Sequence, residues 1–372
     1  MKRLIYLSLQ ATKQGQASYA HVHEIINGLR KKGWEVQLFE PTYSKSNHTP
    51  GPFVRLLAFI KVQFILLINL IKIKPDAIYI RNHFATFPTA LVAKLLRKPV
   101  VQEVNGPYED LFIAWPKTKM LAPLFKWLIR KQLKWADAVV AVTPQLGEWV
   151  QSETGQRSIQ IIPNGANPEI FQPQAQLKYD LPKPYAVFFG ALARWQGIDT
   201  LIKAAYSPYW PPDVNMIIVG DGAEREVVEK AALNNTKITY LGPVPYLDIA
   251  GIVANSVASL VPKNNQGDRS STGLFPLKLF ETIACGAPVI VTDFPGQADL
   301  VRRYSCGLVI PPDDPDALAK AVTILYTNPT MRLDMGVRGR KAIEEEHSWD
   351  CRAAKTDDLL RQILASKRGK RE

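Results

Sequence analysis

The chain has 372 residues, which is too many for one ordinary hydrophobic core and favours two domains. Its 47% hydrophobic and 22% charged residues are typical of a folded globular protein and exclude a largely disordered chain. The net charge of +12 predicts an anionic partner. We expect no nucleic acid, because no helix-turn-helix, zinc-finger or RNA-recognition pattern accompanies the charge.

The three cysteines, Cys285, Cys306 and Cys351, have no short spacing. They argue against a disulfide framework or a zinc site and favour a reducing compartment. The first residues, MKRLIYLSLQAT, lack a small-residue cleavage site, which predicts a buried strand rather than a signal peptide. These features predict a cytoplasmic protein.

Short β-branched runs alternate with helical segments along the chain. They lie at 4–9, 35–40, 77–80, 100–104, 138–143 and 159–163, and again at 185–190, 216–220, 238–242, 257–262, 288–293 and 307–311. Apolar strands separated by helices predict parallel sheets covered on both faces, so the two series predict two Rossmann-like domains. The break falls in the proline-, glycine- and asparagine-rich stretch 164–184. Because ligands bind at the carboxyl ends of such strands, we expect the site in the interdomain cleft.

Residues 56–71 form the most membrane-like run, LLAFIKVQFILLINLI. The run is shorter than the roughly 20 residues needed to span a bilayer, and it contains Lys61. It predicts a buried helix, with membrane contact as the less favoured alternative.

Segment 111–136 is basic and aromatic. It contains six Lys or Arg residues and no acid, interleaved with Trp and Phe. The pattern suits either an anionic membrane surface or a solvated surface helix, and we weigh the two equally.

Two glycine turns follow early strands of the second half. Gly190 ends a strand in FFGALARWQGID, and Arg194 in that loop could clamp a diphosphate or simply be solvated. In MIIVGDGAER, Gly220 and Gly222 resemble half a dinucleotide fingerprint, but Arg225 stands where the third glycine is needed. This turn suits a nucleotide contact or a plain tight turn equally well.

The stretch GLFPLKLFETIACGAP predicts a helix that begins near Pro276. Free amides before it, together with the positive helix terminus, would form an anion site. Lys278 and Glu281 lie at i and i+3 on one face, where they could hold a phosphate and a ribose diol. A surface salt bridge explains the same spacing, and the spacing alone favours it.

A further glycine, Gly15, lies between the first strand and a helix that begins near Ser18, at another place suited to a phosphate or sugar. His21 and His23 are two residues apart and do not share a helical face, so a metal pair is not expected.

Eight motifs in register resemble the retaining glycosyltransferases of family 4, also called glycosyl transferases group 1, which have the GT-B fold. The motifs are GQASYAHVHEIINGLRKKGWEVQLFEP, VVQEVNGPYEDL, IIPNGANPEIFQP, FFGALARWQGIDTLIKA, IIVGDGAER, ITYLGPVP, FPLKLFETIACGAPVIVTD and CGLVIPPDDPDALAKAV. They cover nearly the whole chain. The resemblance implies the same architecture as the periodicity, two Rossmann-like domains whose parallel sheets face an interdomain cleft.

The resemblance implies transfer of a sugar from a nucleotide-diphosphate donor to an acceptor hydroxyl, with anomeric retention through a front-face mechanism. It assigns ribose binding to Glu281 and stabilisation of the leaving diphosphate to Lys278 and Arg194. The remaining donor-side residues that it implies are Gly15, Gly190, Gly220, Val244, Gly273, Leu274 and Phe275. On the sugar or acceptor side it implies Glu103, Asn105 and His21, with Asn105 among the catalytic residues.

Three positions depart from the family pattern. Gly273 stands where relatives have the first acid of an E-x7-E pair, so Asp268 substitutes, backbone amides suffice, or donor choice differs. Ala191 and Gln196 stand where a diphosphate-binding arginine and lysine are usual, and Asn105 replaces an acceptor-side histidine. These departures also leave open a catalytically impaired member.

We expect neither a metal nor a cofactor. Asp314-Pro315-Asp316 matches the D-x-D metal motif of another transferase fold, but it precedes a helix, where aspartates cap amides. The nucleotide sugar would be a co-substrate.

The resemblance predicts an acceptor-binding domain at 1–170, a nucleotide-sugar-binding domain at 171–346, and a C-terminal helix at 347–372 that packs back on the first domain and ends in a frayed basic tail. Its acceptor would be lipid-linked or a saccharide, in surface polysaccharide or glycolipid synthesis. We expect a cytoplasmic enzyme, peripheral on the inner face of the plasma membrane if segment 111–136 binds lipid. The alternatives are a GT-B sugar-nucleotide epimerase and a non-catalytic sugar-nucleotide-binding subunit.

Overall fold

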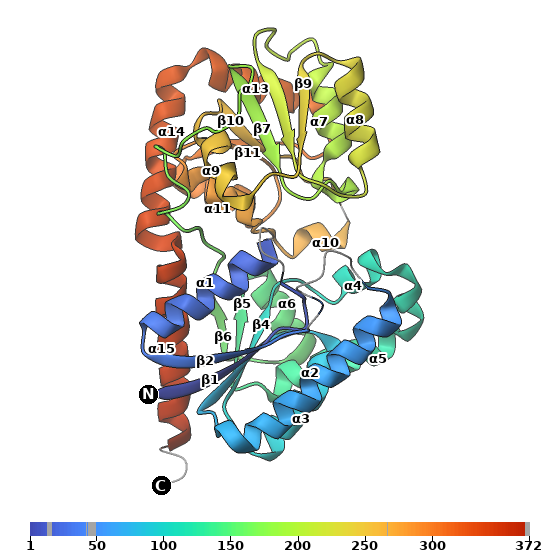
Figure 1. Ribbon diagram of the computed structural model, residues 1–372, viewed down its shortest axis with the longest axis vertical. Coiled ribbons are helices and arrows are strands. Elements are labelled where there is room, and N and C mark those ends of the chain that lie inside the picture. Colours follow the sequence, from blue (N-terminus) through green and yellow to red (C-terminus); the bar gives the residue numbers. More distant parts are fainter. Residues whose placement is uncertain (13–16, 42, 44–49, 266, 369–372) are drawn as a thin grey trace. The chain divides into compact units, whose positions relative to one another are not determined.

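The computed structural model describes residues 1–12, 17–41, 43, 50–265 and 267–368. The chain divides into two compact units, each built around one six-stranded parallel sheet (Figure 1). Unit 1 comprises Met1–Pro163 and Trp349–Glu372, and unit 2 comprises Asn164–Ser348. Two parallel sheets flanked by helices confirm the predicted pair of Rossmann-like domains.

The sheet of unit 1 has the strand order β2-β1-β3-β4-β5-β6. Its strands are β1 (Lys2–Leu7), β2 (Trp34–Phe39), β3 (Ala77–Arg81), β4 (Val100–Val104), β5 (Ala138–Ala141) and β6 (Ile159–Ile161). The order reverses between β1 and β3, because the chain runs outward from this pair in both directions. The carboxyl ends of β1 and β3 therefore mark the expected ligand crevice of this unit.

Helices cover both faces of this sheet, which is why its inner strands are apolar on both sides. Helices α1 (Ala17–Lys31) and α15 (Trp349–Arg368) pack together on one face (Figure 1). The other face carries α2 (Pro52–Ile73), α3 (Phe87–Leu95), α5 (Ala122–Trp135) and α6 (Pro144–Thr154), with the short α4 (Glu109–Ala114) before α5. A Cβ on Gly28 of α1 would lie 2.4 Å from Cβ of Ala353, so α1 and α15 approach more closely than a side chain at position 28 allows.

The domain boundaries differ slightly from the predicted ones. Unit 1 ends at Pro163 rather than at residue 170, because the segment after it packs on unit 2. There Nη1 of Arg340 donates to the carbonyl oxygens of Pro168 and Phe171 at 3.1 and 2.7 Å. Unit 2 ends at Ser348 rather than at residue 346. Residues 369–372 of the predicted frayed tail lie outside the described part of the chain.

Helix α2 contradicts the prediction of a buried helix. One stripe faces the core, and it consists of Phe59, Val62, Gln63, Leu66 and Leu70. The opposite face exposes nine large apolar side chains: Phe53, Val54, Leu56, Leu57, Ile60, Phe64, Ile65, Ile68 and Ile71. With 22 residues, α2 is long and apolar enough to cross a membrane by length and composition, and 28% of its most apolar window is buried. A helix that is apolar all round gives no sign in its sequence of which half is covered.

The sheet of unit 2 has the order β12-β11-β10-β7-β8-β9 and reverses between β10 and β7. Its strands are β7 (Tyr185–Phe189), β8 (Asn215–Val219), β9 (Ile238–Gly242), β10 (Ala258–Val261), β11 (Val289–Thr292) and β12 (Gly307–Ile310). Its helices are α7 (Ile198–Ala205), α8 (Arg225–Asn234), α9 (Tyr246–Ala254), α10 (Asp268–Ser271), α11 (Leu277–Ala284), α12 (Gln297–Tyr304), α13 (Pro315–Thr327) and α14 (Pro329–Ala342).

Candidate active site

A glycine directly follows each of the first two strands of unit 2. Gly190 follows β7 and Gly220 follows β8, with φ angles of 130° and 136° that favour glycine. A Cβ on Gly220 would lie 1.8 Å from the carbonyl oxygen of Gly190, and a Cβ on Gly190 would lie 3.0 Å from Nζ of Lys278. Close packing thus accounts for both glycines and leaves room for the lysine, while their contact with a donor stays a prediction.

Lys278 and Glu281 lie one turn apart on α11, and both side chains are buried, at 7% and 5% exposed. Nζ of Lys278 donates to Oε1 of Gln196 at 3.2 Å, and Oε1 of Glu281 accepts from the hydroxyl of Tyr246 at 2.6 Å. Among the described residues no ion pair joins Lys278 to Glu281. The pair is therefore not a surface salt bridge. Burial of two ionisable groups that do not pair with each other is typical of a functional site.

The protonation of this pair is perturbed. Burial raises the pKa of Glu281 to about 7, although the hydrogen bond from Tyr246 and the charge of Lys278 oppose the rise. Burial and the charge of Lys263 hold the pKa of Lys278 well below its usual range, against the opposing effect of Glu281. An anion bound beside Lys278 would favour its charged form, so this site suits an anionic ligand.

A second lysine, Lys263, belongs to this cluster, and the sequence analysis missed it. Its Nζ donates at 2.6 Å to the same Oε1 of Gln196 that accepts from Lys278. Gln196 follows β7 and Lys263 follows β10, so the two flank the point where the strand order reverses. The departure at position 196 thus has a structural reason, because a glutamine oxygen can hold two lysines together. A lysine directly after the buried run VASLVP was the signal that could have identified Lys263.

The segment before α11 offers fewer free amides than expected. The amide of Leu274 donates to the carbonyl oxygen of Pro295 at 2.9 Å, so the prediction of a free amide is wrong for Leu274. The amides of Gly273 and Phe275 have no acceptor among the described residues, and their role stays a prediction. Gly273 has a φ of 79°, a conformation that favours glycine over the acid of its relatives.

Two other predicted residues of unit 2, Arg194 and Val244, lie in loops that follow strands of its sheet. Arg194 opens the short turn Arg194–Gln196, and its side chain is exposed and forms no hydrogen bond with the described residues. Val244 is half-buried in the loop between β9 and α9. Their assignments to the diphosphate and the base stay predictions. Tyr246, which the sequence analysis did not select, holds Glu281 in place.

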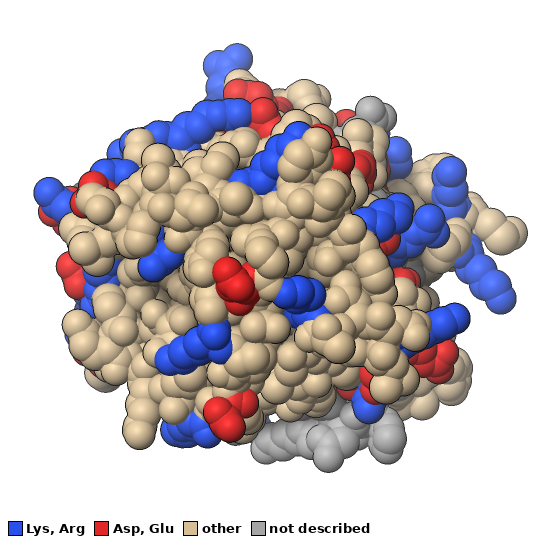
Figure 2. Space-filling model, turned by 90° about the horizontal axis from the view of Figure 1, so that it is seen from above, with Lys and Arg blue, Asp and Glu red and all other residues tan. Residues whose placement is uncertain are grey.

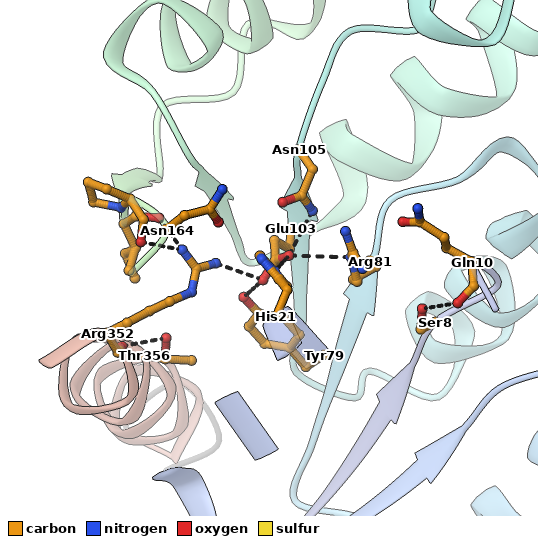
Figure 3. A network of polar contacts seen from close by, with 12 residues as sticks. Ser8, Gln10, His21, Tyr79, Arg81, Glu103, Asn105, Asn164, Arg352 and Thr356 are labelled. Atoms are coloured by element: carbon orange, nitrogen blue, oxygen red, sulfur yellow. Dashed lines mark hydrogen bonds and ion pairs between the residues drawn. The ribbon is translucent and has the colours of Figure 1, made fainter. Parts of the chain in front are cut away.

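In unit 1 the predicted sugar-side or acceptor-side residues converge on one carboxylate (Figure 3). Oε1 of Glu103, on β4, lies 2.6 Å from Nε2 of His21 and accepts from Nδ2 of Asn105 at 2.7 Å. Its Oε2 accepts from the hydroxyl of Tyr79 and, at 3.0 Å, from Nη2 of Arg352. The structure therefore brings His21, Glu103 and Asn105 together from α1, β4 and the following loop.

Glu103 has no exposed surface, and its hydrogen bonds hold its neighbours in place. The sequence analysis expected it to face the sugar or the acceptor, and that contact stays a prediction. Burial disfavours its charge, but His21, Arg352 and Arg81 together hold its pKa well below its usual range. Burial lowers the pKa of His21 to about 4, so at neutral pH the neutral ring donates to the carboxylate. Asn105, which is partly exposed, remains the candidate for ligand contact.

The sequence Asp314-Pro315-Asp316, which matches a D-x-D metal motif, caps a helix as expected. The carboxylate of Asp314 accepts from the amide of Ala317 at 2.9 Å at the start of α13. Within the described ranges, no group of three or more His, Cys, Asp or Glu side chains could hold a metal ion. Gly15 lies outside the described residues, and the side chain of Asp268 is likewise not described.

Two protein families match this chain in succession. The family described as Glycosyltransferase Family 4 matches residues 20–170, and Glycosyl transferases group 1 matches residues 171–342. The chain belongs to these glycosyltransferases. A relative of this glycosyltransferase, the GDP-mannose-dependent monoacylated alpha-(1-6)-phosphatidylinositol monomannoside mannosyltransferase of Corynebacterium glutamicum, is 23% identical over 288 residues, which cover 74% of each chain.

Solved structures confirm the GT-B fold of the glycosyltransferase. Sucrose-phosphate synthase from Thermosynechococcus elongatus superposes with a TM-score of 0.79 at 20% identity, covering 98% of this chain and 100% of that one. The HepE protein of Anabaena, in complex with UDP-glucose, superposes with a TM-score of 0.67 at 17% identity, covering 99% and 100%.

Proposed function

We propose that this glycosyltransferase moves a sugar from a nucleotide-diphosphate donor to an acceptor hydroxyl with retention of the anomeric configuration. The donor binds to unit 2 at the carboxyl edge of the sheet. Lys278, with Lys263 beside it, neutralises the leaving diphosphate, and Glu281 accepts hydrogen bonds from the two ribose hydroxyls. The observation that carries this proposal is the buried, mutually unpaired Lys278 and Glu281 on α11.

The chemistry follows from the surroundings of these groups. A buried ammonium acts on developing phosphate charge more strongly than an exposed one, because little water screens it. An ionised carboxylate has only acceptors, which suits two vicinal hydroxyl donors. Retention rests on the family resemblance. In that scheme the acceptor attacks from the face that the diphosphate leaves, and Lys278 stabilises the departing charge without a metal ion.

We also propose a lipid-linked or saccharide acceptor, in glycolipid or polysaccharide synthesis, at the cytoplasmic face of a membrane. The relative from Corynebacterium glutamicum is named for a phosphatidylinositol monomannoside, and the HepE protein was solved with UDP-glucose. In unit 1 the first turn of α2 contacts the basic segment 111–136, because the guanidinium of Arg55 lies 5.2 Å from the ring centroid of Trp115. The same helix carries the apolar outer face. An apolar face beside basic residues suits an anionic bilayer.

A thermal-shift panel of UDP-, GDP-, ADP- and dTDP-sugars, with EDTA present, tests the donor site. A donor at a hundredfold its Kd stabilises the folded chain by about 2.7 kcal/mol. We expect one donor to raise the melting temperature of the wild type and of the control Glu226→Ala, whose side chain is exposed on α8, but not that of Glu281→Ala. If no donor stabilises the wild type, or if Glu281→Ala responds equally, the proposed site is wrong.

A further inference from the structure

Unit 1 has a pocket of about 470 Å³ at the carboxyl edge of its sheet. Gln10 follows β1, Arg81 ends β3 and Asn105 follows β4, and all three line the pocket. β1 and β3 are the neighbours between which the strand order reverses. The pocket therefore lies where a doubly wound sheet is expected to bind a ligand.

Arg81 is a largely buried cation in the lining of this pocket. Its Nε lies 3.6 Å from Oε1 of Glu103, its side chain is 11% exposed, and its Nη1 is buried without a hydrogen-bond partner among the described residues. Figure 3 shows Arg81 on the side of Glu103 opposite to Arg352, toward Gln10. The exposed part of this guanidinium is a cationic hydrogen-bond donor that an anion in the pocket can approach.

A second arginine, Arg55, lines the same pocket from the first turn of α2. Its guanidinium lies 5.2 Å from the ring centroid of Trp115, also a lining residue. Stacking of this kind orients a guanidinium while leaving its N–H edge free for an anion. His83 adds a neutral donor, because burial and the charge of Arg55 lower its pKa to about 4. Its Nδ1 accepts from the amide of Ala85, which leaves the proton on Nε2.

The charges of the described lining favour an anionic ligand. Two arginines and one carboxylate, that of Asp110, line the pocket, and the buried carboxylate of Glu103 lies 3.6 Å from Nε of Arg81. Arg55 is therefore the cation of the lining that has no carboxylate partner among the described residues. The apolar part of the lining includes Leu9, Phe84, Leu111, Trp115 and Ile129, together with the ring of Tyr108. Guanidinium groups match phosphate oxygens in geometry and charge, and the aromatic and aliphatic wall suits a hydrocarbon chain.

We propose that this pocket binds the acceptor by a phosphate-type anion that carries an apolar chain, so the acceptor is an anionic lipid phosphate. This inference rests on the proposed transferase function and names the acceptor class. Arg55 connects the pocket to the proposed membrane side of unit 1, because it lies in the first turn of the helix whose outer face is apolar. A lipid with its chain against α2 can therefore present its head group to Arg55 and Arg81.

Calorimetric titration with three probes tests the pocket: octyl phosphate below its micelle concentration, inorganic phosphate, and octyl glucoside. We expect the wild type and the control Arg157→Gln, an exposed residue of unit 1 outside the described lining and outside segment 111–136, to bind octyl phosphate most tightly. Arg55→Gln and Arg81→Gln should each weaken it roughly tenfold or more, since each removes a charged hydrogen-bond donor. Arg55 makes no ion pair with the described residues, so we expect Arg55→Gln to fold. This variant therefore tests the pocket even if Arg81→Gln unfolds.

Several results would overturn the proposal. Equal affinity for octyl glucoside, or unchanged octyl phosphate affinity in Arg55→Gln, contradicts an anion site. Equal affinity for inorganic phosphate, with the same arginine dependence, contradicts the lipid assignment and leaves a free anion as ligand. Loss of nucleotide-sugar binding in Arg55→Gln without loss of octyl phosphate would assign the arginine to the donor. Donor thermal shifts on the same variants separate failure of this pocket from failure of the donor site.

Discussion

At the scale of single residues, the raised pKa of Glu281 makes stability depend on pH in an unusual direction. Its pKa is about 7 in the folded chain against 4.5 ordinarily, so the folded state binds the extra proton between these values. The free energy of unfolding therefore includes the full contribution of the neutral side chain below pH 4.5, and this contribution is lost as the pH rises through 7.

Glu281→Gln tests this directly, because glutamine has no charge to bury. We expect its free energy of unfolding, relative to the wild type, to rise by up to about 3 kcal/mol between pH 5 and pH 8 and then level off. Urea unfolding at pH 5, 6, 7 and 8 measures the difference. A difference that does not change with pH would mean that Glu281 is not buried in its neutral form.

Arg352 gives a second residue-scale prediction. Its side chain is 2% exposed and pairs with the fully buried Glu103. Arg352→Ala leaves a buried carboxylate without its strongest cation, and we expect a loss of about 3–5 kcal/mol in the free energy of unfolding. Lys355→Ala, at an exposed position of the same helix, should change it by less than about 0.5 kcal/mol. Equal losses in the two variants would contradict the buried pair.

How far the site could be predicted depends on sequence distance. Lys278 and Glu281 share one helix, so their spacing placed them on one face. The spacing alone favoured a surface salt bridge, and the family motif assigned them to the donor site. Lys263 and Gln196 are 67 residues apart, and Arg352 lies 249 residues from Glu103. Such contacts depend on strand order and on the return of the last helix, which spacing does not encode. The φ of Gly273 and the engaged amide of Leu274 likewise become visible only in the folded backbone.

At the scale of elements, the contact of α1 with α15 ties the C-terminal helix to unit 1. Gly28 allows it, because any Cβ there would meet that of Ala353. We expect Gly28→Val to lower the free energy of unfolding by about 1–3 kcal/mol through overpacking. The exposed neighbour Asn27→Val is the control for the helix propensity of valine. Denaturant unfolding of the pair measures the difference, and equal effects would contradict tight packing of α1 on α15.

Strands were the best predicted elements. Every β-branched run became part of a strand or its end, because buried parallel strands are apolar on both faces. The prediction that α2 is buried was wrong, because the burial of this helix depends on which neighbours cover it. The domain boundary moved by a few residues for the same reason, as Arg340 binds the carbonyls of Pro168 and Phe171 across a long sequence interval.

At the scale of the whole molecule, we propose that unit 1 lies on an anionic membrane surface. Figure 2 shows basic and acidic side chains interspersed over the face in view, so no patch of one sign covers that face. Segment 111–136, in contrast, carries six cations and no acid. It contacts the first turn of α2, the helix whose outer face is apolar.

Flotation with phosphatidylglycerol–phosphatidylcholine vesicles tests this placement. We expect the wild type to float at low salt and to dissociate at high salt, because ions screen the basic segment. Ile60→Ser with Phe64→Ser, both on the outer face of α2, should weaken binding roughly tenfold or more. Leu233→Ser, exposed on α8 of unit 2, should not. A wild type that stays at the bottom of the gradient at low salt would rule out the membrane surface.

The central claim is that unit 2 transfers a sugar from a nucleotide donor with the help of Lys278. Its most direct test is sugar release or transfer from each labelled nucleotide sugar, measured in EDTA for the wild type, Lys278→Ala and the control Lys203→Ala, an exposed lysine of the same unit. We expect turnover of one donor by the wild type and the control, and a loss of roughly 100-fold or more in Lys278→Ala, because the leaving diphosphate loses its buried cation. If wild type and Lys278→Ala turn over every donor equally, or if all three proteins are inert with every donor, the account is contradicted.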